Sequence, residues 1–178
     1  DVGDFGAVLG KAEREADRAG FAARRDASAA QGKLRGIGLC YYIESILGNP
    51  SENVRVDFNE DGTVTVFVGT VSNGQGHETV ISQYLSDQTG IPLDKIRFFQ
   101  ADSDAIPIGG GTGGSRSVTT QTNVTLSATK AMIAAYSEFL ADEMGVSADD
   151  ISFDDERFRS EGSNLTPTFL EAADMARA

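Results

Sequence analysis

The sequence predicts an α+β fold in which helices pack on a mixed or antiparallel sheet. Two segments that alternate apolar and polar residues, 54–58 and 63–68, flank the turn sequence Asn-Glu-Asp-Gly at 59–62, and this pattern indicates a β-hairpin. The expected element order, αβββαβαββα, lacks the regular alternation of a doubly wound parallel sheet. The chain has 178 residues, 40% of them apolar, which is enough for one domain with a core.

The N-terminal quarter of the chain is expected to contain one helix and one strand. Over residues 4–26, apolar residues recur at helical spacing, at Phe5, Val8, Leu9, Ala12, Ala16 and Ala19. Residues 27–35 are small and polar, as is typical of a connection. Residues 36–46 are rich in aromatic and β-branched residues, which favours a buried strand with Cys40 in the core.

Glycines mark the expected helix ends in the middle of the chain. A helix is predicted from the segment 72–79 through about Asp87, because Gly90 stops it, and a strand follows over residues 95–99. A long loop over residues 102–114 then leads to a second helix.

The second helix is expected to be the longest one. Ser115 or Ser117 caps its start, and it runs to about Met144, with Gly145 beyond its end. Short strands near residues 151–153 and 157–160 follow, and then a helix over 167–176 that Thr166 caps and Pro167 begins.

Charge and cysteine content exclude several classes of protein and site. A net charge of −12 repels nucleic-acid phosphates and anionic lipids, so neither nucleic acid nor a membrane is expected as a partner. One cysteine allows no internal disulfide, and no iron–sulfur cluster or zinc ion held by protein thiolates. No apolar stretch approaches the ~20 residues that span a bilayer, and no signal peptide is recognised, which favours a cytoplasmic protein.

Two glycine-rich segments, 74–79 and 109–117, are the candidates for a binding site. Each is expected to open a helix, where unpaired backbone N–H groups attract anions and glycine permits close approach. Arg116 adds a planar cation suited to phosphate. The other interpretation of each segment is an ordinary helix start with turn glycines. The candidate cofactor-binding residues are Gly74, Gln75, Gly76, His77, Thr112, Gly113, Gly114, Ser115, Arg116 and Ser117.

Several familiar sites do not fit these segments. Residues 109–114 match G-x-G-x-x-G, but about ten residues separate them from the preceding strand, and no P-loop lysine is present. The lone His77 supports neither a His-rich metal site nor a Ser-His-Asp triad. Asp102 and Asp104 suggest a cation site, although the lack of an EF-hand loop favours solvated carboxylates. We therefore assign no catalytic residue and no metal ligand.

In combination, these motifs resemble those of a known family. Three runs of this chain resemble the molybdopterin-binding region of the xanthine dehydrogenase and aldehyde oxidase family. They are Gly-Gln-Gly-His-Glu-Thr at 74–79, Gly-Ile-Pro at 90–92 and Gly-Gly-Thr-Gly-Gly-Ser-Arg-Ser at 110–117. Residues 35–38 and 61–66 are similar to the carbon monoxide dehydrogenase large-subunit branch. The resemblance covers essentially the whole chain, so residues 1–178 are expected to be a single fragment of the molybdopterin-binding domain.

The resemblance implies a molybdenum-dependent oxidoreductase of the hydroxylase type. In this family the dithiolene sulfurs of the pterin hold the molybdenum, so the protein supplies hydrogen bonds to the cofactor. By resemblance, Gln75 and Gly76 lie near the metal end and the pterin, and residues 112–117 lie against phosphates or a cytosine dinucleotide tail. A small-molecule substrate is hydroxylated, or carbon monoxide is oxidised. The implied partners are the rest of the large subunit, an iron–sulfur subunit and an FAD subunit.

Some questions stay open in the sequence. The family's catalytic glutamate motif has no counterpart here, and Glu78 is not assigned that role, so the isolated chain is expected to be inactive. The alternative hypothesis is a stand-alone phosphate- or nucleotide-binding module without redox chemistry, and a third is a structural domain whose glycines serve turns only. Neither the oligomeric state nor the substrate (purine, aldehyde, carbon monoxide or heterocycle) is fixed by this sequence.

Overall fold

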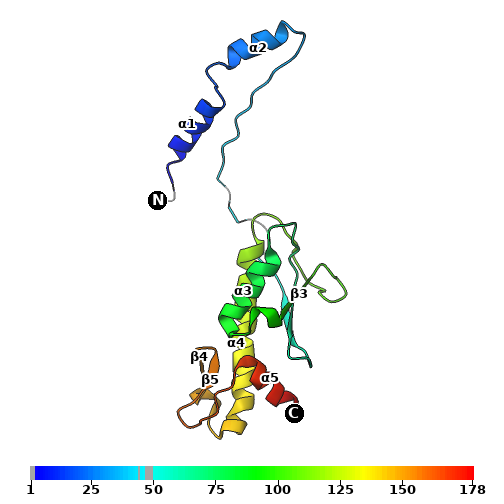
Figure 1. Cartoon of the computed structure of the whole chain (residues 1–178), viewed down its shortest axis with the longest axis vertical. Coiled ribbons are helices and arrows are strands. Elements are labelled where there is room, and N and C mark those ends of the chain that lie inside the picture. Colours follow the sequence, from blue (N-terminus) through cyan, green and yellow to red (C-terminus); the bar gives the residue numbers. More distant parts are fainter. Residues whose placement is uncertain (1–2, 44, 47–49) are drawn as a thin grey trace. The chain divides into compact units, whose positions relative to one another are not determined.

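The chain divides into two units in the computed structural model, which describes residues 3–43, 45–46 and 50–178. The first unit is Asp1–Glu44 and contains helices α1 (Phe5–Glu15) and α2 (Phe21–Ala29). The second unit is Ser45–Ala178, and the strands and the other three α-helices of the described residues all belong to it (Figure 1).

The single helix expected over residues 4–26 is wrong, because the helix is interrupted between α1 and α2. Asp4 caps α1, since its carboxylate accepts a backbone N–H of the first turn at 2.9 Å. Asp17 then has a left-handed backbone conformation, with φ of 44°. The guanidinium of Arg24 donates to the backbone carbonyls of Ala16 and Asp17 at 3.0 and 2.8 Å. These bonds satisfy carbonyl groups at the end of α1 and so stabilise the break.

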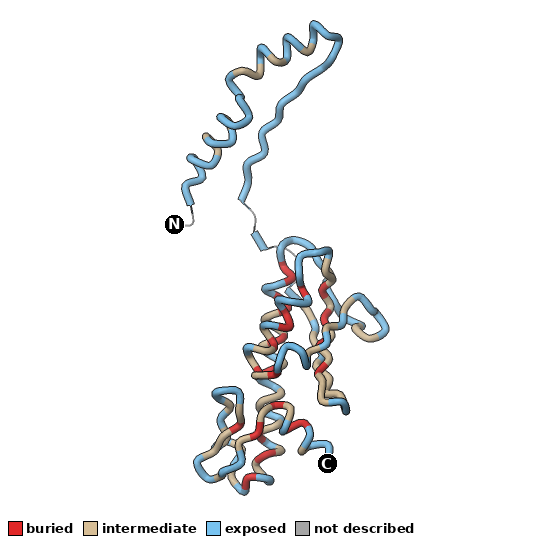
Figure 2. Tube along the Cα trace, in the orientation of Figure 1, coloured by how far each residue is buried: buried red, intermediate tan, exposed pale blue. Residues whose placement is uncertain are grey.

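The strand expected over residues 36–46 is also wrong, apart from residue 44, which lies outside the described residues. The backbone of residues 36–43 pairs with no strand among the described residues. A strand needs a hydrogen-bonded neighbour and a covered face, and no residue in the range 3–43 is buried (Figure 2). Cys40, expected in the core, is exposed. The exposed large apolar side chains nearby are Leu34, Ile37, Leu39, Tyr41, Tyr42 and Ile43.

The β-hairpin and the mixed sheet are confirmed in the second unit. Strands β1 (Val54–Phe58) and β2 (Val64–Val68) pair antiparallel, and β3 (Ile96–Gln100) lies parallel on the other side of β2. Gly62 in the hairpin turn has a positive φ of 73°, which glycine adopts without strain. Along β2, the buried Val64, Val66 and Val68 alternate with less buried residues, so one face of the sheet is covered.

Two helices cover this face. α3 (His77–Thr89) connects β2 to β3 through a short 3₁₀ helix (Leu93–Lys95), and α4 (Ser117–Met144) packs against α3 and β1. Both helices end as expected at a glycine with left-handed backbone, Gly90 and Gly145. Val66, Val68, Ile81 and Leu85 form the buried core here, within the buried residues that Figure 2 marks on the strands and helices.

The C-terminal part packs on the far half of α4. After a short 3₁₀ helix (Ala148–Asp150), strands β4 (Ser152–Asp154) and β5 (Arg157–Arg159) form a two-stranded antiparallel sheet, and α5 (Phe169–Arg177) closes the chain. Phe158 and Phe169 are fully buried, with ring centroids 5.1 Å apart. This arrangement of helices on small sheets confirms the α+β fold class. Among the described residues, no helix combines the length and the apolar character that crossing a bilayer demands.

The expected cap of α5 at Thr166 is wrong, because Thr168 takes that position. The Thr168 hydroxyl accepts the backbone N–H of Glu171 at 3.2 Å, and the Glu171 carboxylate accepts the backbone N–H of Thr168 at 2.8 Å. This capping box satisfies two N–H groups at once, which a helix that starts two residues earlier could not achieve with Glu171.

Candidate functional site

The two glycine-rich segments lie together at the end of the second unit where α3 and α4 begin (Figure 1). The hydroxyl of Thr112 bonds to Val71, three residues before the first segment: it accepts the backbone N–H of Val71 at 3.0 Å and donates to the Val71 carbonyl at 2.5 Å. The Ser117 hydroxyl in turn donates to the Thr112 hydroxyl oxygen at 3.3 Å. The chain that enters α3 is therefore joined to the loop that enters α4, as a shared binding site requires.

The turn before α3 has the backbone conformation of a glycine-dependent helix start. Gly74 and Gly76 have positive φ values of 102° and 79°, which L side chains rarely adopt. Gly76 is the N-cap and has no side chain to cap the helix, so the first N–H groups of α3 have no side-chain acceptor among the residues that the structure describes. The side-chain oxygen of Gln75 accepts the N–H of Asn73, so this glutamine folds back on its own turn.

His77, the first residue of α3, is 2% exposed. Its Nδ1 atom is one of two buried side-chain atoms without a hydrogen-bond partner in the part of the chain that the structure describes. Burial lowers the pKa of the imidazole, because the charged form loses hydration, and so it favours neutral His77. An unpaired buried polar group costs about 1–3 kcal/mol, which a ligand that supplied the missing partner would offset.

The start of α4 also has no bond from the side chain of its N-cap residue. Arg116 is the N-cap residue, and its side chain does not cap the helix, so the N-cap position expected at Ser115 or Ser117 is wrong. The Ser117 hydroxyl points to Thr112 instead. Gly114 and Ser115 both have φ of 57°, and a non-glycine residue in this region costs on the order of 1 kcal/mol. The backbone strain at Ser115 therefore lies within the candidate site.

Arg116 lies inside the loop rather than on its surface, with an exposed fraction of 4%. Its Nη1 donates to the Glu52 carboxylate at 3.0 Å and to the carbonyl of Gly111 at 2.8 Å, and its Nη2 donates to the carbonyl of Ser51 at 2.7 Å. The Glu52 side chain is fully buried. Glu52 was not a candidate in the sequence, because it lies 64 residues from Arg116 and no local pattern marks such a pairing.

A hollow of about 320 Å³ borders the loop before α4. It is lined by Val68, Gly69, Ala101, Asp102, Ser103, Ile106, Pro107, Gly109 and Gly111. The Asp102 carboxylate accepts the backbone N–H groups of Asp104 and Ala105 at 2.9 and 3.3 Å, so it organises its own turn. Within the described ranges, no cluster of three or more His, Cys, Asp or Glu residues could hold a metal ion.

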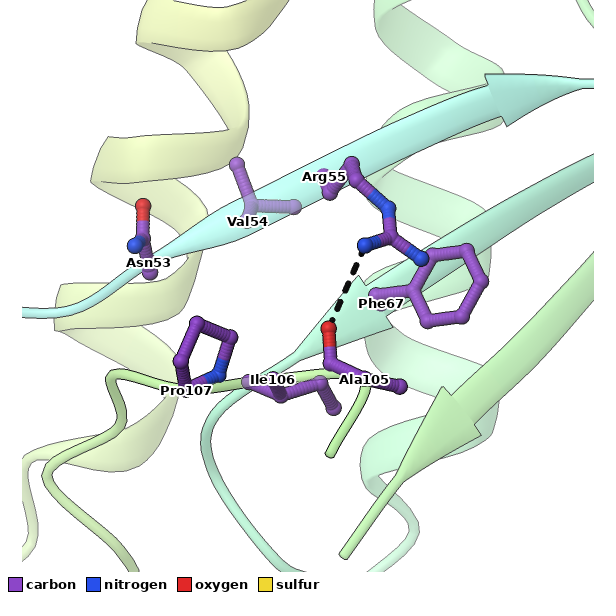
Figure 3. Close-up of a pocket in the computed structure, with 7 residues that line it drawn as sticks. All are labelled: Asn53, Val54, Arg55, Phe67, Ala105, Ile106 and Pro107. Atoms are coloured by element: carbon purple, nitrogen blue, oxygen red, sulfur yellow. Dashed lines mark hydrogen bonds between the residues drawn. The ribbon is translucent and has the colours of Figure 1, made fainter. Parts of the chain in front are cut away.

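A second hollow, of about 210 Å³, surrounds Arg55 at the edge of the sheet (Figure 3). The Arg55 guanidinium carbon lies 3.9 Å from the ring centroid of Phe67, and Nη1 donates to the carbonyl of Ala105 at 3.2 Å. The other lining residues are Asn53, Val54, Ile106 and Pro107. None of the ten candidate cofactor-binding residues lines either hollow, but Gly109 and Gly111 of the glycine-rich loop line only the first, so we treat the second as separate from the site.

Comparisons with known proteins agree with these observations. The family model described as molybdopterin cofactor-binding domain matches residues 11–178. The carbon monoxide dehydrogenase large chain of Afipia carboxidovorans is 32% identical over an alignment of 141 positions including gaps, and the match covers 73% of this chain and 17% of the relative. The large chain of the same name from Hydrogenophaga pseudoflava is 29% identical over an alignment of 191 positions including gaps, and the match covers 99% of this chain and 23% of the relative.

A solved structure gives the same result. The crystal structure of the Cu,Mo-CO dehydrogenase in its carbon monoxide reduced state matches with a TM-score of 0.68 and 28% identity, over 96% of this chain and 24% of that one. These similarities confirm the resemblance inferred from the motifs at 74–79 and 110–117. The chain spans about a fifth of the length of the curated relatives it matches.

Proposed function

The chain belongs to the molybdopterin cofactor-binding domain family, and from this premise we propose that its two glycine-rich segments hold part of the molybdopterin cofactor. One observation carries the proposal: α3 and α4 begin at the same end of the second unit, neither N-cap side chain caps its helix, and the Thr112 hydroxyl bonds to Ser117 of α4 and to Val71 in the chain that leads to α3. Such a pair presents backbone N–H groups and two positive dipole ends to one anion. The proposed cofactor-binding residues are those at 74–77 and 112–117.

The donors at this site suit the cofactor. Backbone N–H groups at the two helix starts are hydrogen-bond donors for phosphate oxygens, whereas the hydroxyls of Thr112 and Ser117 already donate to Val71 and to Thr112 and hold the loop in place. The buried Nδ1 of His77 has no hydrogen-bond partner among the described residues, and a pterin could supply one. When bound, the cofactor supplies the redox chemistry of molybdenum, whereas the residues of this chain bind it and fix its orientation. We assign no catalytic residue within this chain.

We extend the proposal to the complete protein as a molybdenum-dependent oxidoreductase acting on a small molecule. The relatives are large chains of carbon monoxide dehydrogenase, and this chain spans about a fifth of their length. In the proposal, electrons pass to iron–sulfur and FAD groups on partner subunits, and the isolated chain is inactive. The cytosine dinucleotide tail of the cofactor and the cytoplasmic location stay predictions from the sequence.

We also propose that both units belong to one molybdopterin-binding domain, which the rest of a large subunit completes. The match to the family model, residues 11–178, extends over most of the first unit and the whole of the second. Residues 36–43 are exposed and rich in apolar side chains, and a longer subunit would supply a neighbour for them. A stand-alone phosphate-binding module would use the same helix N-termini, but the similarity to large chains along 99% of the chain favours the cofactor.

A glycine substitution before α3 tests the proposal against a matched control. Gly76→Ala places a side chain on a φ of 79° at the candidate site, and Gly62→Ala does so on a φ of 73° in the hairpin turn. Neither added Cβ would meet another atom within 4 Å, so both cost about 1–2 kcal/mol of backbone strain. The complete subunit should lose molybdenum and pterin several-fold only with Gly76→Ala, as measured after purification from cells that make the cofactor.

Two outcomes would count against the proposal. Normal molybdenum content in the Gly76→Ala subunit would show that the turn before α3 does not hold the cofactor. Equal losses in both variants would show that the occupancy follows protein stability instead of contacts at this turn.

A further inference from the structure

A buried ion pair lies beneath the loop that enters α4. Nη1 of Arg116 is 3.0 Å from Oε2 of Glu52, and the two side chains are 5% and 0% exposed. In every other ion pair among the described residues, both side chains are at least 34% exposed. Such exposed pairs are screened by water and contribute little, whereas a buried pair holds its surroundings in one arrangement.

The pair is bonded directly to the backbone of the glycine-rich loop. Besides Arg116, the Glu52 carboxylate accepts the backbone N–H of Gly110 at 3.1 Å. Arg116 donates to the carbonyl of Gly111 at 2.8 Å and to the carbonyl of Ser51 at 2.7 Å. Glu52 therefore accepts the N–H of Gly110, and Arg116 donates to the carbonyl of Gly111, the next residue of the loop.

Glycines around the pair leave no room for side chains. A Cβ on Gly110 would lie 2.5 Å from Nη1 of Arg116, and a Cβ on Gly69 would lie 2.2 Å from Oε1 of Glu52. A Cβ on Gly109 would lie 2.7 Å from the Cα of Gly69. The first glycines of the loop are thus explained by close packing around the ion pair and against residue 69, without any contact to a phosphate.

We propose that Glu52 and Arg116 form a positioning pair that fixes the conformation of residues 109–117. Arg116 then supports the cofactor through the loop rather than through its own charge. The Arg116 guanidinium already donates to three protein acceptors and is almost fully buried. An arginine that binds a phosphate directly instead presents its N–H donors to the ligand. The inference rests on the proposed function and deepens it.

Substitutions at Glu52 separate positioning from direct contact. E52Q keeps Arg116 in the protein but removes the carboxylate that orients it. A positioning pair predicts that E52Q, R116K and R116Q all reduce the molybdenum content of the complete subunit by about tenfold, because neither Gln nor Lys reproduces the bonds on both sides of the loop. A direct phosphate contact predicts full content in E52Q and partial content in R116K, since both retain a cation.

Amide hydrogen exchange in the cofactor-free subunit gives a readout that is independent of the cofactor. Because the Glu52 carboxylate holds the Gly110 N–H, E52Q should accelerate exchange over residues 110–114 by about tenfold, with β2 and α3 unaffected. A loss of stability alone would accelerate exchange in all of these segments.

The exposed pair of Arg97 and Asp61, 2.7 Å apart, supplies the control. R97Q should leave the molybdenum content and the loop exchange unchanged. E52Q buries an unpaired cation and can unfold the subunit, so E52Q/R116Q, which buries no charge, is the second test. It should melt at a higher temperature than E52Q, yet retain rapid loop exchange and low molybdenum content.

Normal molybdenum content and normal loop exchange in E52Q, together with loss of molybdenum in R116Q, would overturn the inference and make Arg116 a direct ligand. An unsubstituted subunit without molybdenum would defeat the proposed function instead. The exchange measurement on E52Q would still decide whether the pair positions the loop.

Discussion

At the scale of single residues, His77 combines burial with an unpaired Nδ1 atom at the start of α3. Burial lowers its pKa below the ordinary value of 6.5. As pH falls through 6.5, the unfolded chain takes up a proton at this residue before the folded protein does. The contribution of His77 to stability is therefore complete above this pH and is lost as the pH falls toward the lowered pKa of the folded state.

We predict that His77→Phe flattens this part of the pH dependence. Phenylalanine keeps an aromatic ring but has no titrating nitrogen and no unpaired polar atom. Urea unfolding of the cofactor-free protein at about pH 7.5 and about pH 5.5 should show a loss of stability for the unsubstituted protein and nearly none for the variant.

An equal loss in both proteins would assign the effect to other groups. Asp61 and Glu171 also have lowered pKa values, mainly through hydrogen bonds from Thr63 and Thr168 respectively. The ordinary pKa values of the two carboxyl groups, 3.8 and 4.5, lie below the pH range of the experiment, so their contributions to stability are lost only at more acidic pH.

Local patterns predicted the residues whose conformation their immediate neighbours decide. Gly62, Gly90 and Gly145 take the left-handed conformations expected of a hairpin turn and two helix ends. Arg116 could not be understood in the same way, because its partner Glu52 lies 64 residues away and the pairing depends on how the sheet and α4 pack. The sequence therefore located the loop but not what holds it.

At the scale of elements, the capping box of α5 makes a prediction with a control two residues away. Thr168→Ala removes the hydroxyl that accepts the N–H of Glu171 and should lower the unfolding free energy by about 1 kcal/mol. The backbone carbonyl of Thr166 accepts a hydrogen bond from Arg157, and alanine keeps that carbonyl. Thr166→Ala should therefore change the unfolding free energy by less than about 0.5 kcal/mol.

Chemical denaturation of both threonine variants measures the difference. Equal effects at the two positions would mean that the cap does not limit the stability of α5. The sequence placed this cap at Thr166 because Pro167 suits a first helical position, whereas the reciprocal bonds with Glu171 select Thr168.

Element prediction succeeded where the alternation of residues and a short turn decide the structure, and failed where strand pairing or a side-chain bond to the backbone decides it. The strands of the hairpin are joined by a short turn, so alternation and the Asp-Gly sequence were sufficient. Residues 36–43 have the composition of a strand, but the described residues offer them no pairing partner. The break between α1 and α2 depends on bonds from Arg24, which apolar periodicity does not reveal.

At the scale of the whole molecule, the exposed apolar segment predicts a contact with the rest of a large subunit. We expect the amide groups of residues 36–43 to exchange rapidly in this chain alone and slowly in the complete subunit, if the proposed neighbour covers them there. The hairpin turn at residues 59–62 should exchange rapidly in both. Equal exchange of residues 36–43 in the two proteins would show that the rest of the subunit leaves this segment uncovered.

The most direct test of the central claim is the molybdenum and pterin content of the complete subunit. It should be purified with its partner subunits from cells that make the cofactor, and analysed by elemental analysis and by the fluorescence of the oxidised pterin. The account predicts about one molybdenum and about one pterin per chain, as expected for a resident cofactor. A well-folded subunit that contains neither would contradict it, and the glycine-rich segments would then have to be explained as ordinary helix starts.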